Sequence, residues 1–279
     1  LPIAYYGAWY KVMILLVTGL TVSRMGKILT LLGTEKEDVE NAKYLFLISP
    51  MIQLGLIGVG QVDFFVNFFI VSIALAFLEK KESKMAWLVS LSLIFKPFAF
   101  LMYIPLLLLL YYKEPKKMIG QGLKIMSVPL LMKILGKTYF INYDVLQSRY
   151  QRAFHFPERI FPDHHYMVSL FVVLYCIICY VCAVKCSEGK VKKTDYLIYP
   201  FAAYLLFLTT VDWSAHWGLY VVFFLILFGQ LRERKQDFHI LYGVMGIAYP
   251  LYVVCRWPKE FDVDLISNGL LNTFLSHAY

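Results

Sequence analysis

Charged side chains are scarce in this sequence. They make up 16% of its 279 residues, whereas hydrophobic residues make up 59% and the mean hydropathy is +0.62. Soluble domains carry about 25% charged residues, so this composition excludes an ordinary water-soluble domain. We predict an integral membrane protein, because several apolar segments approach the roughly 20 residues that a helix needs to cross a bilayer.

The sequence also lacks the short motifs of soluble nucleotide and hydrolase chemistry. It has no Walker loop, no dinucleotide fingerprint and no nucleophile elbow. The adjacent His164 and His165 lack a zinc-ligand spacing, so no metal site is assigned. Lys and Arg number 27 against 19 Asp and Glu, which in so apolar a chain indicates cytoplasmic loops rather than nucleic-acid binding. We expect no nucleic-acid partner and no certain cofactor, with a divalent metal left open.

Cysteine is rare, and four of the five cysteines fall in one run, YCIICYVCAVKC. Their spacing imitates that of iron–sulfur ligands. However, steps of three and four place these residues on one face of an apolar helix, whereas cluster ligation needs an irregular loop. We interpret them as small packing residues of a transmembrane helix, namely Cys176, Cys179, Cys182 and Cys186.

Four short basic segments predict the cytoplasmic side of the membrane. They are EKKESK, KEPKK, VKCSEGKVKK and QLRERKQ. Residues 85–112 lie between the first two and are too few for two full spans. We therefore predict a short re-entrant hairpin there, with its turn at Lys96 and Pro97, because Pro97 disfavours helix at the preceding residue and interrupts the hydrogen-bond ladder.

The same reasoning predicts an all-α polytopic transmembrane helix bundle with about nine to eleven membrane segments, forming a single membrane domain over 1–279. TEKEDVENAK is expected to be a cytoplasmic loop. Residues 138–165 are expected to form an extracytoplasmic loop with an amphipathic helix in YDVLQSRYQRAF that lies on the membrane surface. The other predicted spans are 12–32, 44–59, 64–78, 118–137, 166–184, 195–211, 217–229 and 238–254.

Several polar residues fall on the outer side of this map and are candidate site residues. Lys96, at a helix break, could hold a phosphate, although a lysine that snorkels to the interface would look the same. Gln61 and Asp63 follow a glycine-rich turn in LGLIGVGQVDFF, where Asp63 could bind substrate, serve catalysis or simply favour a helix N-terminus. In VDWSAHWGLY, Asp212 and His216 lie among tryptophans, which suits sugar or lipid-phosphate binding and equally an interfacial aromatic belt.

The order of these motifs resembles a known family. Ser49-Pro50, then Gly60-Gln61-x-Asp63 leading into a helix, a basic loop, and LIFKP at 93–97 resemble the polytopic GT-C class of glycosyltransferases. The similarity is greatest to bacterial mannosyltransferase-like membrane proteins similar to the second mannosyltransferase of glycosylphosphatidylinositol assembly, and to polyprenol-phosphate-mannose-dependent mannosyltransferases. The resemblance covers roughly residues 1–112 well and the rest mainly by its helix pattern.

The resemblance implies transfer of a mannose-like hexose from a polyprenyl-phosphate sugar to a lipid- or glycan-linked acceptor. The site would face outward from a bacterial plasma membrane, in contact with membrane lipid. An acidic residue would deprotonate the acceptor, and Lys96 would stabilise the departing phosphate. The family's acid usually lies in a first outer loop that is expected upstream of this chain, which leaves Asp63 as the candidate within it. His216 and Tyr220 correspond to parts of a His-Glu-Arg-Tyr-like run.

Three other classes stay open. A lipid-linked-saccharide polymerase or flippase would share the apolar composition, and a polymerase would use outer-loop arginines such as Arg149, Arg152 and Arg159. A transporter would show related halves, which the sequence does not display. A purely structural membrane subunit is the third alternative.

Overall fold

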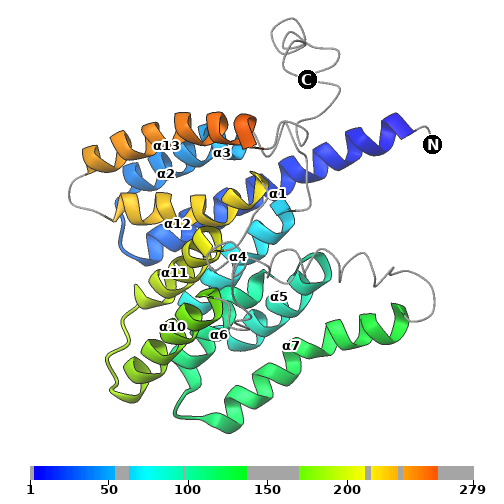
Figure 1. Ribbon diagram of the computed structural model, residues 1–279, viewed down its shortest axis with the longest axis vertical. Helices are drawn as coiled ribbons and strands as arrows, with labels where there is room; N and C mark the ends of the chain where they lie inside the picture. Colours follow the sequence, from blue (N-terminus) through cyan, green and yellow to red (C-terminus); the bar gives the residue numbers. More distant parts are fainter. Residues whose placement is uncertain are drawn as a thin grey trace, which may run out of the picture. The chain divides into compact units, whose positions relative to one another are not determined.

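The computed structural model describes residues 3–53, 63–96, 98–136, 170–210, 215–231 and 235–256. Every regular element in these ranges is a helix, so the all-α prediction is confirmed for the described part of the chain (Figure 1). The amphipathic helix that we expected in the outer loop 138–165 lies outside the described residues.

The helices follow one another closely and are joined by short turns wherever the connection is described. In chain order they are α1 (Ile3–Leu31), α2 (Lys36–Ile48), α3 (Pro50–Gln53), α4 (Asp63–Leu78), α5 (Glu82–Phe95), α6 (Ala99–Tyr111), α7 (Pro115–Gly136), α10 (Leu170–Ser187), α11 (Asp195–Thr210), the 3₁₀ turn η2 (Ala215–Gly218), α12 (Leu219–Gln230) and α13 (Lys235–Arg256).

Helix α2 corrects a predicted loop and a predicted segment limit. It begins at Lys36, so most of TEKEDVENAK is helical rather than a loop, and the helix ends at Ile48, well before the predicted limit of 59. Two acidic residues occupy its first turn, where they oppose the positive end of the helix dipole. Pro50 disfavours helical dihedrals at Ser49, whose ψ is 124°, and so the chain breaks before α3.

Two helical segments are long and apolar enough to cross a membrane, namely Val12–Leu31 of α1 and Leu170–Ser187 of α10. The predicted nine to eleven spans are therefore not shown. Asp63–Leu78, Ala99–Tyr111 and Leu219–Gln230 are apolar but shorter. The longest of these has 16 residues and rises about 24 Å, less than the hydrocarbon thickness of about 30 Å.

The chain divides into two compact units that are nested in the sequence. Unit 1 comprises Leu1–Phe68 and Ser214–Tyr279, and unit 2 comprises Phe69–Trp213. Helix α4 therefore begins in unit 1 and ends in unit 2. Nine of its thirteen apolar residues are buried and none is exposed, as expected for a helix that is hydrophobic on every side.

In unit 1, α12 packs against α1, α2, α3 and α13, and α13 also packs against α3. Ten of the twelve residues of α12 are buried, which makes it the core helix of this unit. Gly229 of α12 allows the closest approach to α13, because a Cβ at this position would lie 2.3 Å from the ring of Phe238. The glycine thus permits the two helices to touch through the Phe238 ring.

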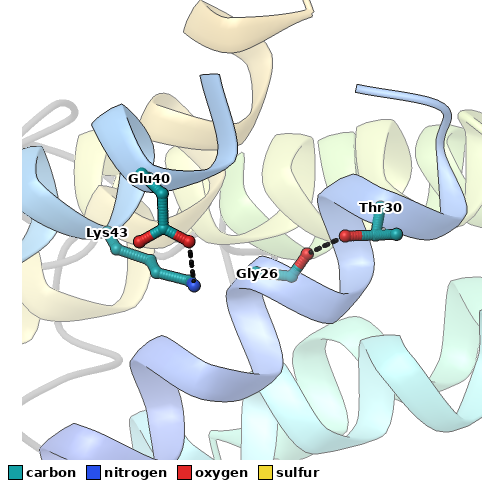
Figure 2. Close-up of polar contacts among 4 residues, drawn as sticks. All are labelled: Gly26, Thr30, Glu40 and Lys43. Carbon is teal, nitrogen blue, oxygen red and sulfur yellow. Dashed lines mark hydrogen bonds and ion pairs between the residues drawn. The ribbon is translucent and has the colours of Figure 1, made fainter. Parts of the chain in front are cut away.

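Helices α1 and α2 also approach closely, at Gly26. A Cβ at Gly26 would lie 2.6 Å from Cε of Lys43, whose side chain reaches toward α1 (Figure 2). The Lys43 ammonium lies 2.6 Å from Oε1 of Glu40 on its own helix, and the Thr30 hydroxyl donates a 3.0 Å hydrogen bond to the Gly26 carbonyl. The absent side chain at Gly26 leaves room for the Lys43 stem.

In unit 2, α6 packs against α10 and α11, and α5 packs against α7. The helical ladder breaks between α5 and α6, where Lys96 is extended with φ −158° and ψ 148°. The predicted helix break is therefore confirmed at Lys96. Whether these helices form a re-entrant hairpin in a membrane stays a prediction.

Candidate functional site

Two of the predicted site residues meet in unit 1. The Tyr220 hydroxyl donates a hydrogen bond to Oδ1 of Asp63, across 157 positions of sequence. Asp63 is the first residue of α4, where the helix dipole favours a carboxylate, and Tyr220 is the second residue of α12. We refer to these residues as the Asp63–Tyr220 pair.

The Asp63–Tyr220 pair is completely buried, with neither residue exposed. An ionised carboxylate is tolerated away from water only when hydrogen bonds or charges compensate it, and the Tyr220 hydroxyl is one such compensation.

Two further polar residues belong to the surroundings of Asp63 and were not predicted. Burial, and to a smaller extent the Asp63 carboxylate, raise the pKa of the Tyr10 phenol above its usual value. Asn67 lies one helical turn after Asp63 and is 1% exposed. Its Oδ1 has no hydrogen-bond partner among the described residues.

The sequence contains a weak local indication of a role for Tyr10 and for Asn67. Tyr10 begins a stripe of α1 at helical spacing that continues through the buried residues Ile14 and Val17. An asparagine inside the apolar run DFFVNFFIVSIALAFL is a polar exception of the kind that membrane segments keep for function.

Lys96 lies in unit 2, at the end of α5. Its backbone N–H donates a 3.1 Å hydrogen bond to the Ser92 carbonyl, and its side chain is half-buried. The ammonium lies 6.0 Å from the centroid of the Phe98 ring, at the limit of a cation–π contact. The structure thus places Lys96 at a helix break beside the Phe98 ring, and its binding of phosphate stays a prediction.

The remaining predicted residues are only partly described. His216 belongs to η2, directly before α12, but its side chain is not described. Gln61 and Asp212 lie outside the described residues. The substrate roles predicted for these three residues stay predictions.

No group of three or more histidine, cysteine or acidic side chains gathers within the described ranges in a way that could hold a metal. The four clustered cysteines lie along α10, as the helical interpretation of their spacing predicted. Cys182 is buried and Cys176 is exposed, so they do not share one environment.

Comparison with known proteins gives no identification. No protein-family model matches the chain, and neither the curated proteins nor the solved structures include a significantly similar one.

Proposed function

We propose that this chain is an integral membrane glycosyltransferase that moves a hexose from a polyprenyl-phosphate sugar to a lipid- or glycan-linked acceptor on the outer face of a bacterial plasma membrane. Two helices with the length and apolarity of membrane spans support the membrane location. Large apolar side chains exposed along α10 and α13 support it further, because water would oppose such a surface. The motif order around Asp63 and Lys96 supports the reaction class.

The Asp63–Tyr220 pair is the observation that carries the proposal. Both residues are candidate site residues by the family resemblance, and they are 157 positions apart in the chain. A buried acid that accepts a hydrogen bond from tyrosine is a costly arrangement in an apolar protein. Ionisable groups at membrane depth are functional candidates for this reason.

In the proposed reaction Asp63 takes the proton of the acceptor hydroxyl. The acceptor oxygen forms a bond to the anomeric carbon, and the bond from that carbon to the phosphate oxygen breaks with its electron pair. Attack in line with the departing group inverts the anomeric centre. The resemblance to the GT-C class assigns the charge on the departing polyprenyl phosphate to Lys96, independently of Asp63. Asp63 is the proposed base within this chain, and Tyr220 orients its carboxylate.

The test is sugar transfer by the purified protein in proteoliposomes, using radiolabelled polyprenyl-phosphate mannose and glucose and lipid acceptors. Asp63→Asn removes the charge but keeps an oxygen that can accept the Tyr220 hydrogen bond, so the fold should persist. We expect Asp63→Asn to lower the transfer rate about 100-fold or more, the usual loss for a general base.

Asp237→Asn is the matched control, because Asp237 also lies in the first turn of a helix of unit 1 but is exposed. It should transfer sugar at the wild-type rate. Wild-type activity in Asp63→Asn would refute the assignment of Asp63, and a wild-type protein that transfers neither sugar would refute the reaction class for these donors.

A further inference from the structure

Lys96 lies at the break between α5 and α6, where no helical hydrogen bonds among the described residues join the two helices. Pro97 has no N–H, and Lys96 is extended, so the helical ladder of α5 does not continue into α6. The orientation of Lys96 relative to α6 must therefore depend on contacts made by other helices.

Two tyrosines make such contacts with the first turn of α6. The Tyr204 hydroxyl, from α11, donates a 3.0 Å hydrogen bond to the carbonyl of Phe98, the residue before α6. The Tyr175 hydroxyl, from α10, donates a 2.9 Å hydrogen bond to the carbonyl of Leu101. Two neighbouring helices thus hold the backbone within five positions of Lys96.

The Leu101 carbonyl is available for a specific reason. It lies four residues before Pro105, which has no N–H to donate to it. The proline inside α6 therefore leaves an acceptor without its helical donor, and Tyr175 supplies one. A carbonyl in an apolar interior gains more from such a donor than one in water.

Aromatic packing reinforces this arrangement. The Phe98 ring lies 5.3 Å from the ring of Phe207 of α11, and Phe207 meets Phe171 of α10 edge-on at 5.8 Å. Phe171 in turn stacks on Tyr175 at 5.5 Å. Rings at these separations attract one another, so Tyr175 and the three phenylalanines form one connected cluster, which Tyr204 joins through its hydrogen bond to the Phe98 carbonyl. We call it the aromatic clamp.

The geometry points to Tyr204 and Tyr175 as positioning residues that hold Lys96 where it meets the phosphate of the polyprenyl-phosphate donor. This inference rests on the proposed function. Tyr204 is the stronger member, because it is fully buried and bonds to a backbone carbonyl only two positions from Lys96. Loss of either hydroxyl frees the start of α6 and shifts Lys96 relative to the donor.

The experiment compares the KM for polyprenyl-phosphate sugar in Tyr204→Phe, in Lys96→Ala and in the double variant. A hydrogen bond of ordinary net strength corresponds to roughly two- to ten-fold in a binding constant. We expect Tyr204→Phe to raise the donor KM by this factor with a smaller effect on kcat. In the Lys96→Ala background the same change should leave KM unaltered, because both act through one group.

Tyr242→Phe is the matched control. Its hydroxyl also donates to a backbone carbonyl, that of Leu45 at 3.4 Å, but in unit 1. It should leave the donor KM unchanged. A Tyr204→Phe effect no larger than that of Tyr242→Phe, or one that persists in the Lys96→Ala background, would overturn the positioning role.

A second measurement separates this inference from the proposed function. Lys96→Cys, in a chain whose native cysteines are replaced by serine, is treated with a water-soluble thiol reagent. Tyr204→Phe should change the labelling rate at least about two-fold, since the same hydrogen bond sets the position. An unchanged labelling rate overturns the positioning role of the aromatic clamp. If the labelling rate changes but Lys96→Ala leaves the donor KM unchanged, the positioning role is upheld and phosphate binding by Lys96 is refuted.

Discussion

The hydroxyl of Ser90 hydrogen bonds to a carbonyl that a proline leaves without its helical partner. Pro129, inside α7, has no N–H for the Ile125 carbonyl four residues earlier. Ser90 of α5 is fully buried and donates a 2.7 Å hydrogen bond to that carbonyl, while the Val128 N–H donates to Ser90 at 3.3 Å. Tyr175 makes the equivalent contact in α6, so two proline positions in unit 2 are compensated by side chains of a neighbouring helix.

This compensation predicts a coupling between Ser90 and Pro129. Ser90→Ala should lower the free energy of unfolding by about 1–2 kcal/mol, because a buried carbonyl loses its donor. In a Pro129→Ala background the residue 129 amide can serve Ile125 itself, so Ser90→Ala should cost clearly less. Chemical denaturation in detergent micelles measures the free energy of unfolding in both backgrounds. If Ser90→Ala lowers it equally in the two, the Ser90 hydrogen bond does not compensate for Pro129.

The candidate site residues came from different signals in the sequence. Lys96 interrupts an apolar run, Asp63 follows a glycine-rich turn, and Tyr220 was selected by the family resemblance. The pairing of Asp63 with Tyr220 could not be predicted, because it joins helices far apart in the chain and no local pattern encodes such a contact. Tyr10 was missed because a tyrosine near the end of an apolar helix is also typical of an interfacial belt.

Helix limits were predictable where apolar runs end at charged or glycine-containing segments. The predicted segments 64–78 and 195–211 match α4 (Asp63–Leu78) and α11 (Asp195–Thr210) closely. Helix α2 was missed as an independent helix because its charged first half looks like a loop when membrane spans are sought. Its acidic first turn and the proline that follows it were the available local signals.

The contact between α12 and α13 yields a prediction about helix packing. Gly229→Ala would place a methyl group against the Phe238 ring and should destabilise the protein by about 1–3 kcal/mol, as overpacked cores do. Gly243→Ala, in α13, has open space around it and should stabilise the helix by up to about 1 kcal/mol. Thermal unfolding in detergent compares the two variants, and a Gly229→Ala protein as stable as Gly243→Ala would contradict the close approach.

The orientation of the whole chain in the membrane gives a further prediction. Lys190, in the basic loop between α10 and α11, has a highly exposed side chain. In intact cells, with native cysteines replaced, Lys96→Cys should react with a membrane-impermeant thiol reagent, while Lys190→Cys should react only after the cells are permeabilised. Labelling of Lys190→Cys in intact cells would reverse the predicted topology and place Lys96 on the cytoplasmic side.

The chemical fate of a labelled donor tests the central claim most directly. Wild-type protein in sealed proteoliposomes would receive polyprenyl-phosphate mannose labelled in the sugar, together with lipid acceptor, and the lipids would be separated by chromatography. A membrane glycosyltransferase moves the label to the acceptor and releases an equal amount of polyprenyl phosphate. Label that stays on the donor but crosses the bilayer intact would instead contradict transfer and identify a lipid-linked-saccharide flippase.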